Sequence, residues 1–297
     1  MTSRITSSTI TDGQRKQFIR FLEDSGEKAL VQSGIEKDGL QRLLENGGEF
    51  QDRIITAIKE LSLTNQFVDQ EVWSGYGYLS GYKTRSIVQQ VGTLREYFPE
   101  LVSTDLLATL EKHSFQLPVG AEGFFVIPHW SKVAPMYHAA VEKVLNLLAT
   151  AYDGRFTNYR KGELTPNKLR ETSKKVRAME GLQRAQNADI FLVPAQFGVR
   201  HRGRSTRRAR AVMNGSEFGL GVYENGIMLL THPNRLQNED DLLLDCAGDE
   251  FSWSNDGVFQ RAPFFEFSKG RLRFGMRELD CINTRYGSAS GFSFNQH

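Results

Sequence analysis

The stretch from Ile190 to Asn214 reads IFLVPAQFGVRHRGRSTRRARAVMN, and its three parts predict one structural unit. Ile190–Val193 is an apolar run typical of a buried strand, and Ser205 or Thr206 is a suitable N-cap for the helix that follows. Asn214-Gly215 is a typical helix stop. Strand, loop and helix in this order are the unit from which α/β sheets are built. We therefore expect a mixed α/β domain around this segment.

Short apolar runs and amphipathic stretches alternate from about residue 116 to the end of the sequence. Apolar runs bounded by turn residues are typical of strands, and apolar residues at helical spacing are typical of helices. A hairpin is expected across Ser268-Lys269-Gly270, where the residue pairs around Phe265 and Phe274 would oppose each other. Further strands are expected at Phe124–Ile127, Phe218–Val222, Ile227–Leu230 and Leu242–Cys246, and helices over about 134–152 and from Thr165-Pro166 to about Arg184.

The first hundred residues have a different pattern, which predicts helices. Ser86 and Ser103 are suitable N-caps for two of them, and the Gly- and Tyr-rich segment Tyr76–Tyr82 follows neither helical nor strand periodicity. We predict an α+β protein, with a helical region at 1–115 followed by a mixed α/β domain with a central sheet at 116–297. The apolar residues at helical spacing before the Gly/Tyr segment are Phe18, Phe21 and Leu22, then Leu40, Leu43 and Leu44, then Ile54, Ile55, Ile58 and Leu61.

The composition is that of an ordinary globular protein. Of 297 residues, 39% are hydrophobic and 24% are charged, so the chain can bury a sizeable core. The first nine residues are mostly polar and lack the apolar run of a signal peptide, and no stretch approaches the roughly 20 apolar residues of a membrane span. The only cysteines, Cys246 and Cys281, form no CxxC motif, which favours a reducing compartment over a zinc site. The sequence thus predicts a cytoplasmic protein without membrane partners.

Positive charge is concentrated in one part of the chain. Residues 155–210 hold 15 Lys and Arg against 4 Asp and Glu, although the formal net charge of the whole chain is only +2. Cations this close together repel one another and usually face an anion. The loop and helix start after a strand also present free backbone N–H groups, to which phosphate binds readily. The candidate anion-binding residues are Arg200, His201, Arg202, Arg204, Ser205, Arg207, Arg208 and Arg210.

Three partners could face these arginines. The first is a polyanion, most naturally nucleic acid, for which the cationic helix carrying Lys168, Lys174, Lys175 and Arg184 would enlarge the surface. The second is a phosphorylated small molecule, because the guanidinium fork suits phosphate. The third is internal: the arginines would pair with the acidic segment and the protein would be a structural or interaction module. The acidic residues in that segment are Glu239, Asp240, Asp241, Asp245, Asp249 and Glu250.

No complete catalytic, metal or nucleotide motif is present, so candidates for catalysis rest on position alone. Asp245, Asp249 and Glu250 follow the apolar run 242–244, and ligands of open α/β sheets gather at strand ends. If that strand ran parallel to Ile190–Val193, an enzyme, either a hydrolase or a phosphotransferase, could hold a phosphate and a divalent metal there. Loop capping is the simpler interpretation of these carboxylates. The sequence specifies no cofactor and assigns no metal ligand.

His232 and Cys246 could form a nucleophile–base pair, whereas a buried structural cysteine is the simpler interpretation. Trp130 and Trp253 could line a ligand or pack at the edge of the core. The helices joined at Gly47-Gly48 could form a helix-turn-helix unit reading DNA through Arg53 and Lys59, although acidic residues surround both.

Several segments resemble an uncharacterised protein family of small-genome uncultivated bacteria. They include PAQFGVRHRGRSTRRAR at Pro194–Arg210, the segment Glu217–Glu250 and YGSASGF at Tyr286–Phe292. The N-terminal stretches GGEFQ and GYGYLSGYK show the same similarity. The resemblance implies an intracellular bacterial protein, and it implies no activity, cofactor or catalytic residue.

Overall fold

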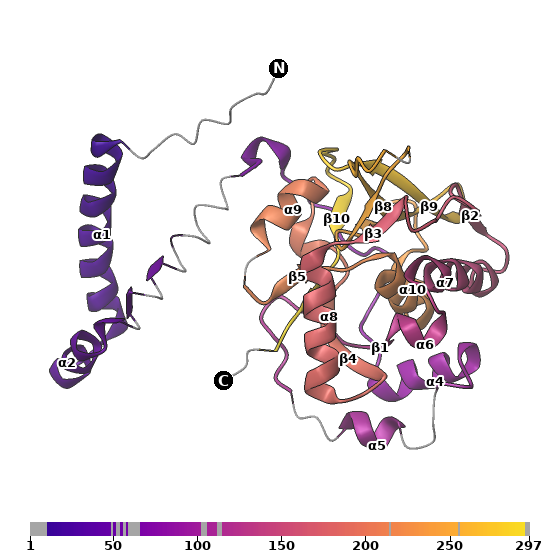
Figure 1. Ribbon diagram of the computed structural model, residues 1–297, viewed down its shortest axis with the longest axis horizontal. Helices are drawn as coiled ribbons and strands as arrows, with labels where there is room; N and C mark the ends of the chain where they lie inside the picture. The colour runs from indigo at the N-terminus through magenta and orange to yellow at the C-terminus, as the bar shows by residue number, and fades with distance from the viewer. Residues whose placement is uncertain are drawn as a thin grey trace. The chain divides into compact units, whose positions relative to one another are not determined.

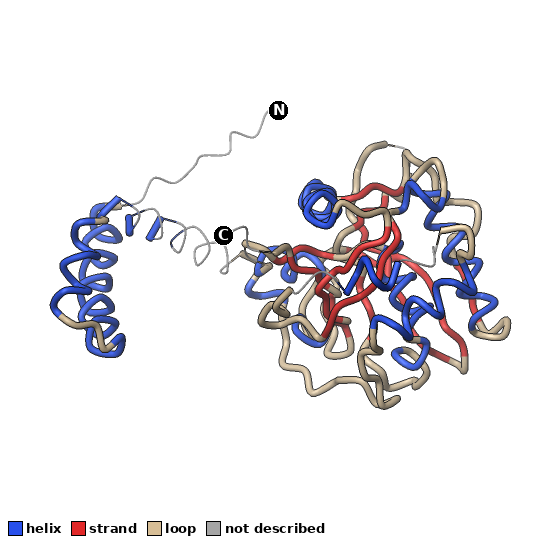
Figure 2. Tube along the Cα trace, turned by 90° about the horizontal axis from the view of Figure 1, so that it is seen from below, coloured by secondary structure: helices blue, strands red, loops and turns tan. Residues whose placement is uncertain are grey.

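The structure is a computed structural model, and it falls into two compact units, Met1–Lys59 and Glu60–His297 (Figures 1 and 2). The residues that it describes are 11–48, 50–51, 54–55, 58, 66–101, 106–111, 115–213, 215–254 and 256–294.

The first unit contains the helices α1 (Asp12–Ser33) and α2 (Lys37–Glu45), as the apolar spacing predicts. Thr11 begins α1 with a capping box, and Gly34 ends it in the left-handed conformation that glycine adopts without strain. No described side chain of this unit is buried. The third predicted helix, Ile54–Leu61, and the candidate DNA-reading residues Arg53 and Lys59 lie largely or wholly outside the described residues.

The second unit contains two sheets, which lie in its centre with helices around them (Figure 2). Within the described residues, the smaller sheet has the strand order β1-β4-β11-β5 and is antiparallel throughout. One of its two inner strands, β4, is the apolar run that precedes residues 200–210, here called the arginine segment. The bounds are β1 Gly123–Pro128, β4 Ile190–Gln196, β5 Glu217–Gly219 and β11 Ser290–Phe292.

The larger sheet has the order β10-β6-β8-β7-β3, with β9 pairing β8 and β2 pairing β9. The predicted hairpin is confirmed: Phe265 faces Phe274 in β8–β9, and both Lys269 and Gly270 have positive φ, as a tight two-residue hairpin turn requires. The bounds are β2 Phe156–Asn158, β3 Leu169–Glu171, β6 Leu243–Asp245, β7 Asp249–Phe251, β8 Arg261–Ser268, β9 Arg271–Glu278 and β10 Tyr286–Ser288.

Helices cover both sheets and enclose a large apolar core, beside which Ala209, Met213 and Ala247 form a small separate cluster. α8 packs on β4 and β5, whereas α10 contacts α7, α4 and β1 (Figure 1). The helices are α4 Ile87–Tyr97, α5 Leu106–Glu111, α6 Trp130–Val133, α7 Tyr137–Ala151, α8 Ser173–Gln186, α9 Thr206–Val212 and α10 Val222–Thr231, with 3₁₀ turns η1 Val68–Gln70, η2 Val199–His201 and η3 Pro233–Arg235.

The predicted α+β class is confirmed, since a helical N-terminal region precedes a sheet-containing region. The boundary between the two compact units lies between Lys59 and Glu60, whereas the sequence predicted a boundary after residue 115. The reason lies in α4: Val91 and Leu94 are buried in the same core as the strands. Ser86 begins α4 with a capping box, as predicted, whereas Ser103 lies outside the described residues.

Two local predictions in the second half of the chain are wrong. Ile227–Leu230 is not a strand but part of α10, in which every residue is buried, so its sequence lacks the polar face that marks most helices. The helix expected from Thr165-Pro166 begins instead after Thr172, whose side chain accepts a hydrogen bond from the backbone of Lys175. Between these positions, Leu169–Glu171 form β3, which pairs with β7.

Candidate functional site

Residues 66–86, here called the strap, cross the second unit with little regular secondary structure. Main-chain hydrogen bonds hold the strap to segments far away in sequence. The N–H of Val72 donates to the carbonyl of Gly203 (2.8 Å), and the N–H of Leu242 donates to the carbonyl of Gly77 (2.9 Å). The strap therefore runs from the arginine segment to the loop before β6.

The arginine segment holds the beginning of the strap. The Nε atoms of Arg204 and Arg208 both lie 3.0 Å from Oε2 of Glu71. Arg208 also donates to the carbonyl of Gln66 (2.8 Å). The hydrogen bond from Arg208, helped by Arg204, lowers the pKa of Glu71 against the opposing effect of burial. One strap carboxylate thus neutralises part of two guanidinium charges.

Neighbouring residues of the segment strengthen the same contact. Of the two predicted N-cap candidates, Ser205 and Thr206, it is Ser205 that begins α9, and its hydroxyl donates to the side chain of Gln70 (2.9 Å). The guanidinium of Arg207 lies 4.6 Å from the ring centre of Phe67 and pairs with Asp280 at 3.3 Å. The start of α9 is therefore built around the strap.

The remaining cations of the segment turn to other parts of the second unit. Arg200 and the buried His201 share Glu217, at 3.2 and 2.7 Å. Burial lowers the pKa of His201, although Glu217 opposes this effect. Arg210 pairs with Glu250 at 2.9 Å and donates to main-chain carbonyls of β7 and the preceding turn.

Five of the six arginines therefore contact a carboxylate of the chain itself. Only one of these carboxylates, that of Glu250, belongs to the acidic segment that was expected to pair with the arginines. The other three, Glu71, Glu217 and Asp280, come from other parts of the sequence. Arg202 is the exception: it is exposed, contacts no carboxylate among the described residues, and donates to the carbonyl of Tyr76 at 3.3 Å.

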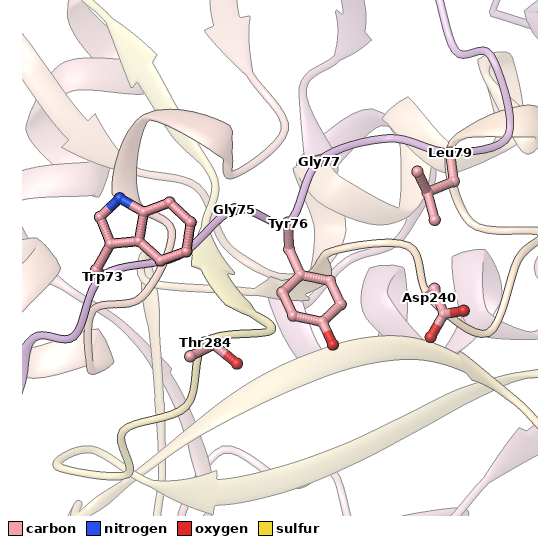
Figure 3. A pocket seen from close by; sticks show the side chains of 7 residues that line it. All are labelled: Trp73, Gly75, Tyr76, Gly77, Leu79, Asp240 and Thr284. Carbon is pink, nitrogen blue, oxygen red and sulfur yellow. The ribbon is translucent and has the colours of Figure 1, made fainter.

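A pocket of about 350 Å³ lies along the middle of the strap (Figure 3). Figure 3 shows the Trp73, Tyr76 and Leu79 side chains following one another on the strap, with Asp240 and Thr284 coming from two other loops. The Trp73 side chain is 86% exposed. The complete lining is Trp73, Gly75, Tyr76, Gly77, Leu79, Asp240 and Thr284.

The pocket's backbone is fixed on both sides. Buried Asp241 accepts hydrogen bonds from the N–H groups of Leu79 (2.7 Å) and Ser80 (3.2 Å), and the Ser74 hydroxyl donates to the carbonyl of Thr284. These bonds use polar groups that an isolated loop would leave to water. The aromatic side chains are therefore presented by a pinned backbone.

The end of the strap enters the core beside a buried cation. The hydroxyl of Tyr78 donates to Glu122 (2.5 Å), and the fully buried Arg235 lies 4.0 Å from the Tyr78 ring centre. Burial raises the pKa of both Tyr78 and Glu122. Arg235 donates to the carbonyls of Phe197 and Leu242, so it links the strap to the residue after β4 and the residue before β6.

A second charged cluster surrounds Lys175, which was expected on the outer face of its helix and is fully buried. Its Nζ lies 2.9 Å from Glu224, 3.0 Å from Asp249 and 3.2 Å from Glu171. The hydroxyl of Tyr137 donates to Asp249 at 2.5 Å. Burial alone would lower the pKa of Lys175, but the three carboxylates raise it.

The other catalytic candidates have separate partners. Asp245 lies in β6 beside Arg277 (3.4 Å), and Glu250 pairs with Arg170 and Arg210. Nε2 of His232 accepts from the Arg85 N–H and Nδ1 contacts the Thr231 hydroxyl, so both ring nitrogens have partners other than Cys246. Cys246 is buried, and burial raises the pKa of its thiol.

The condition under which the acidic and arginine segments would share one sheet edge is not met, because β6 and β4 belong to different sheets, and the two segments meet instead through Arg210 and Glu250. In the part of the chain that the structure describes, no group of three His, Cys, Asp or Glu is arranged to hold a metal ion. Trp130 packs edge-on against Tyr137, and Trp253 lies between Arg160 and Arg261.

Comparisons with known proteins found no matching family model, curated protein or solved structure. None of the described helices has the length and apolar character needed to cross a bilayer.

Trp73, Glu71 and the Lys175 cluster were not recognised from the sequence. Trp73 lies just before the Gly/Tyr segment, and the sequence WSGYGYLSGY from Trp73 to Tyr82 contains a signal: aromatic residues alternating with Gly and Ser in a non-periodic segment. The ion pairs gave no such signal, because their members lie up to 137 positions apart.

Proposed function

We propose that this protein is a binding module whose ligand occupies the pocket on the strap, and that the arginine segment serves to hold the strap in place. The observation that carries the proposal is Trp73, a large aromatic side chain left 86% exposed beside an apolar pocket. Exposed aromatic residues on a fixed backbone are typical of recognition sites.

The size and lining of the pocket support a small organic ligand. A volume of about 350 Å³ falls within the usual range for small-molecule sites. Trp73, Tyr76 and Leu79 supply apolar surface, whereas Asp240 and Thr284 supply polar atoms that can orient a ligand. This combination of an apolar wall and few polar groups is the usual composition of such sites.

The test is a ligand-observed NMR titration with 2-phenylethanol, a neutral aromatic probe. We expect weak binding, with a Kd of about 1 mM or higher for so small a probe, and at least a tenfold loss on Trp73→Ala. Trp253→Phe is the matched control, because Trp253 is also exposed (53%) but lies outside the pocket. Equal binding by both variants and the unsubstituted protein would refute the proposal.

A second candidate function is binding of single-stranded nucleic acid at the same place. One observation favours it: Arg202 donates to the Tyr76 carbonyl, and the Arg285 guanidinium lies 5.8 Å from the Tyr76 ring centre. A partly exposed aromatic residue with guanidinium groups beside it can stack a base and face its phosphate. The arginines of α9 would not take part, because they already contact Glu71, Asp280 and Glu250.

Fluorescence anisotropy of a labelled single-stranded oligonucleotide across a salt series tests this second candidate. Binding through two guanidinium groups predicts that Arg202→Ala/Arg285→Ala lowers the slope of log K against log salt by about 1.4. Arg204→Ala should leave the slope unchanged. An equal effect of Arg204→Ala would instead place the contact at the arginines that face Glu71, and absence of binding at low salt would remove nucleic acid as a partner.

A further inference from the structure

The pocket on the strap has only one formal charge in its lining, the carboxylate of Asp240. Asp240 is exposed and forms no ion pair with any described residue, whereas its neighbours are engaged. Asp241 accepts hydrogen bonds from the strap and from its own loop, and Glu239 accepts from the N–H of Gly270. The Asp240 carboxylate is therefore available to a ligand.

Among the described residues, the nearby cations form no ion pair with this carboxylate. Arg285 donates to the main-chain carbonyl of Glu239, and Arg202 donates to that of Tyr76. Both guanidinium groups thus donate to backbone oxygens, and that of Arg285 also lies 5.8 Å from the Tyr76 ring centre. The lining itself keeps a negative charge.

The aromatic walls of the pocket favour the same sign of ligand charge. The face of an indole or phenol ring is electronegative and attracts an ammonium group. Trp73 and Tyr76 supply two such rings, and Figure 3 shows Asp240 on the other side of the Tyr76 ring from Trp73. Aromatic faces together with one carboxylate are the usual means of recognising a substituted ammonium ion.

We infer that the ligand of this pocket carries a protonated amine on an apolar body, with Asp240 as its counter-ion and Trp73 and Tyr76 as its aromatic walls. This inference rests on the proposed function, since it names the charge of a ligand bound at that site. It predicts a preference for cationic ligands, whereas the nucleic-acid candidate predicts a preference for anionic ones.

Three probes of similar size and different charge test the inference in the NMR titration: 2-phenylethylammonium, 2-phenylethanol and 3-phenylpropionate. We expect the ammonium probe to bind about three- to tenfold more tightly than the alcohol, since an exposed ion pair and a cation–π contact each contribute modestly. The carboxylate probe should bind most weakly. The preference should be largest at low salt.

Asp240→Asn identifies the origin of the preference, because it removes the charge while retaining the shape. In this variant the ammonium and alcohol probes should differ by less than about twofold. Glu239→Gln is the matched control, since Glu239 is adjacent, exposed and absent from the lining, and it should leave the preference intact.

The outcomes separate the two levels of the proposal. Equal affinity for the ammonium probe and the alcohol, both lost in Trp73→Ala, would overturn the amine inference and leave the binding function standing. Tightest binding of the carboxylate would overturn the inference in favour of an anionic ligand. No binding of any probe would reject the proposed function itself.

Discussion

At the scale of single residues, the molecule is organised by a few charged side chains that meet partners from distant segments. Lys175 is the extreme case, because its ammonium group is fully buried and lies within 3.2 Å of three carboxylates. A buried charge is tolerated only when it is paired and hydrogen-bonded. The cluster joins α8 and α10 to β3 and β7, so it fixes two helices against the larger sheet.

Replacing Lys175 should therefore be strongly destabilising. Lys175→Met keeps the chain length and volume but leaves Asp249 and Glu224 buried without their cation, which is expected to lower the free energy of unfolding by about 3 to 5 kcal/mol. Urea unfolding followed by circular dichroism measures this change. Arg177→Met, on the exposed side of the same helix, should change stability by less than about 0.5 kcal/mol. A loss of less than 1 kcal/mol in Lys175→Met would contradict the role assigned to the cluster.

Asp245 should make stability depend on pH in a defined direction. Burial raises its pKa from 3.8 to about 6, against the opposing effect of Arg277. The folded protein therefore binds this proton more tightly than the unfolded chain does, so the contribution of Asp245 to stability is largest below pH 4 and falls as the pH rises to about 6. The expected fall is about 2 to 3 kcal/mol.

Asp245→Asn isolates this effect, because asparagine does not titrate. The free energy of unfolding of the unsubstituted protein, minus that of the variant, should decrease between pH 4 and pH 6.5 when both are measured by urea unfolding. A difference that is constant, or that increases with pH, would show that Asp245 is not held in its neutral form by burial.

Single-residue predictions from the sequence were best where the cause is local. Ser86 and Ser205 were recognised as N-caps, because capping depends only on the next few residues. The crowding of the arginines was also visible, but their partners were not. Glu71 lies 133 positions before Arg204, and only the fold brings the two together.

At the scale of elements, the strap and α10 show two ways in which sequence patterns fail. The strap has no periodicity because main-chain bonds to Gly203 and Leu242, not a ladder or a helix, fix its backbone. α10 lacks a polar face because it is surrounded by α7, α4 and β1. A buried helix and a buried strand have similar apolar composition, so length and context decide between them.

One substitution should weaken the contacts by which Arg204 and Arg208 hold the strap through Glu71, here called the clamp. Glu71→Gln weakens the ion pairs with Arg204 and Arg208. We expect it to lower the free energy needed to open the strap locally by about 1 to 2 kcal/mol. Hydrogen exchange of the Val72 N–H, which donates to Gly203, should then accelerate about tenfold.

Asp280→Asn provides the comparison for this experiment, because it weakens a single, more exposed pair with Arg207. It should have a much smaller effect on exchange in the strap. If both substitutions left exchange unchanged, the arginine segment would not be the clamp that the proposed function requires.

At the scale of the whole molecule, the burial pattern separates the two units. Every buried side chain in the described part of the chain lies at residue 70 or later, and the core cluster begins at Val91. Because stability comes mainly from buried apolar surface, the second unit contains the groups needed to fold by itself. The sequence showed the change from helical periodicity to alternating strand and helix patterns, but it could not show that α4 packs in the same core as the sheets.

Deletion of residues 1–59 is therefore expected to leave the second unit folded. The urea midpoint of the shortened protein should agree with that of the corresponding transition in the full chain. Its affinity for 2-phenylethylammonium should change by less than about twofold, because all seven pocket residues lie between 73 and 284. Circular dichroism during urea unfolding measures the first quantity, and the NMR titration measures the second. A lowered midpoint with intact binding would mean that the first unit stabilises the fold without contributing to the site. Loss of binding at an unchanged midpoint would mean that the site needs residues before the strap, and the pocket as described would then be only part of it.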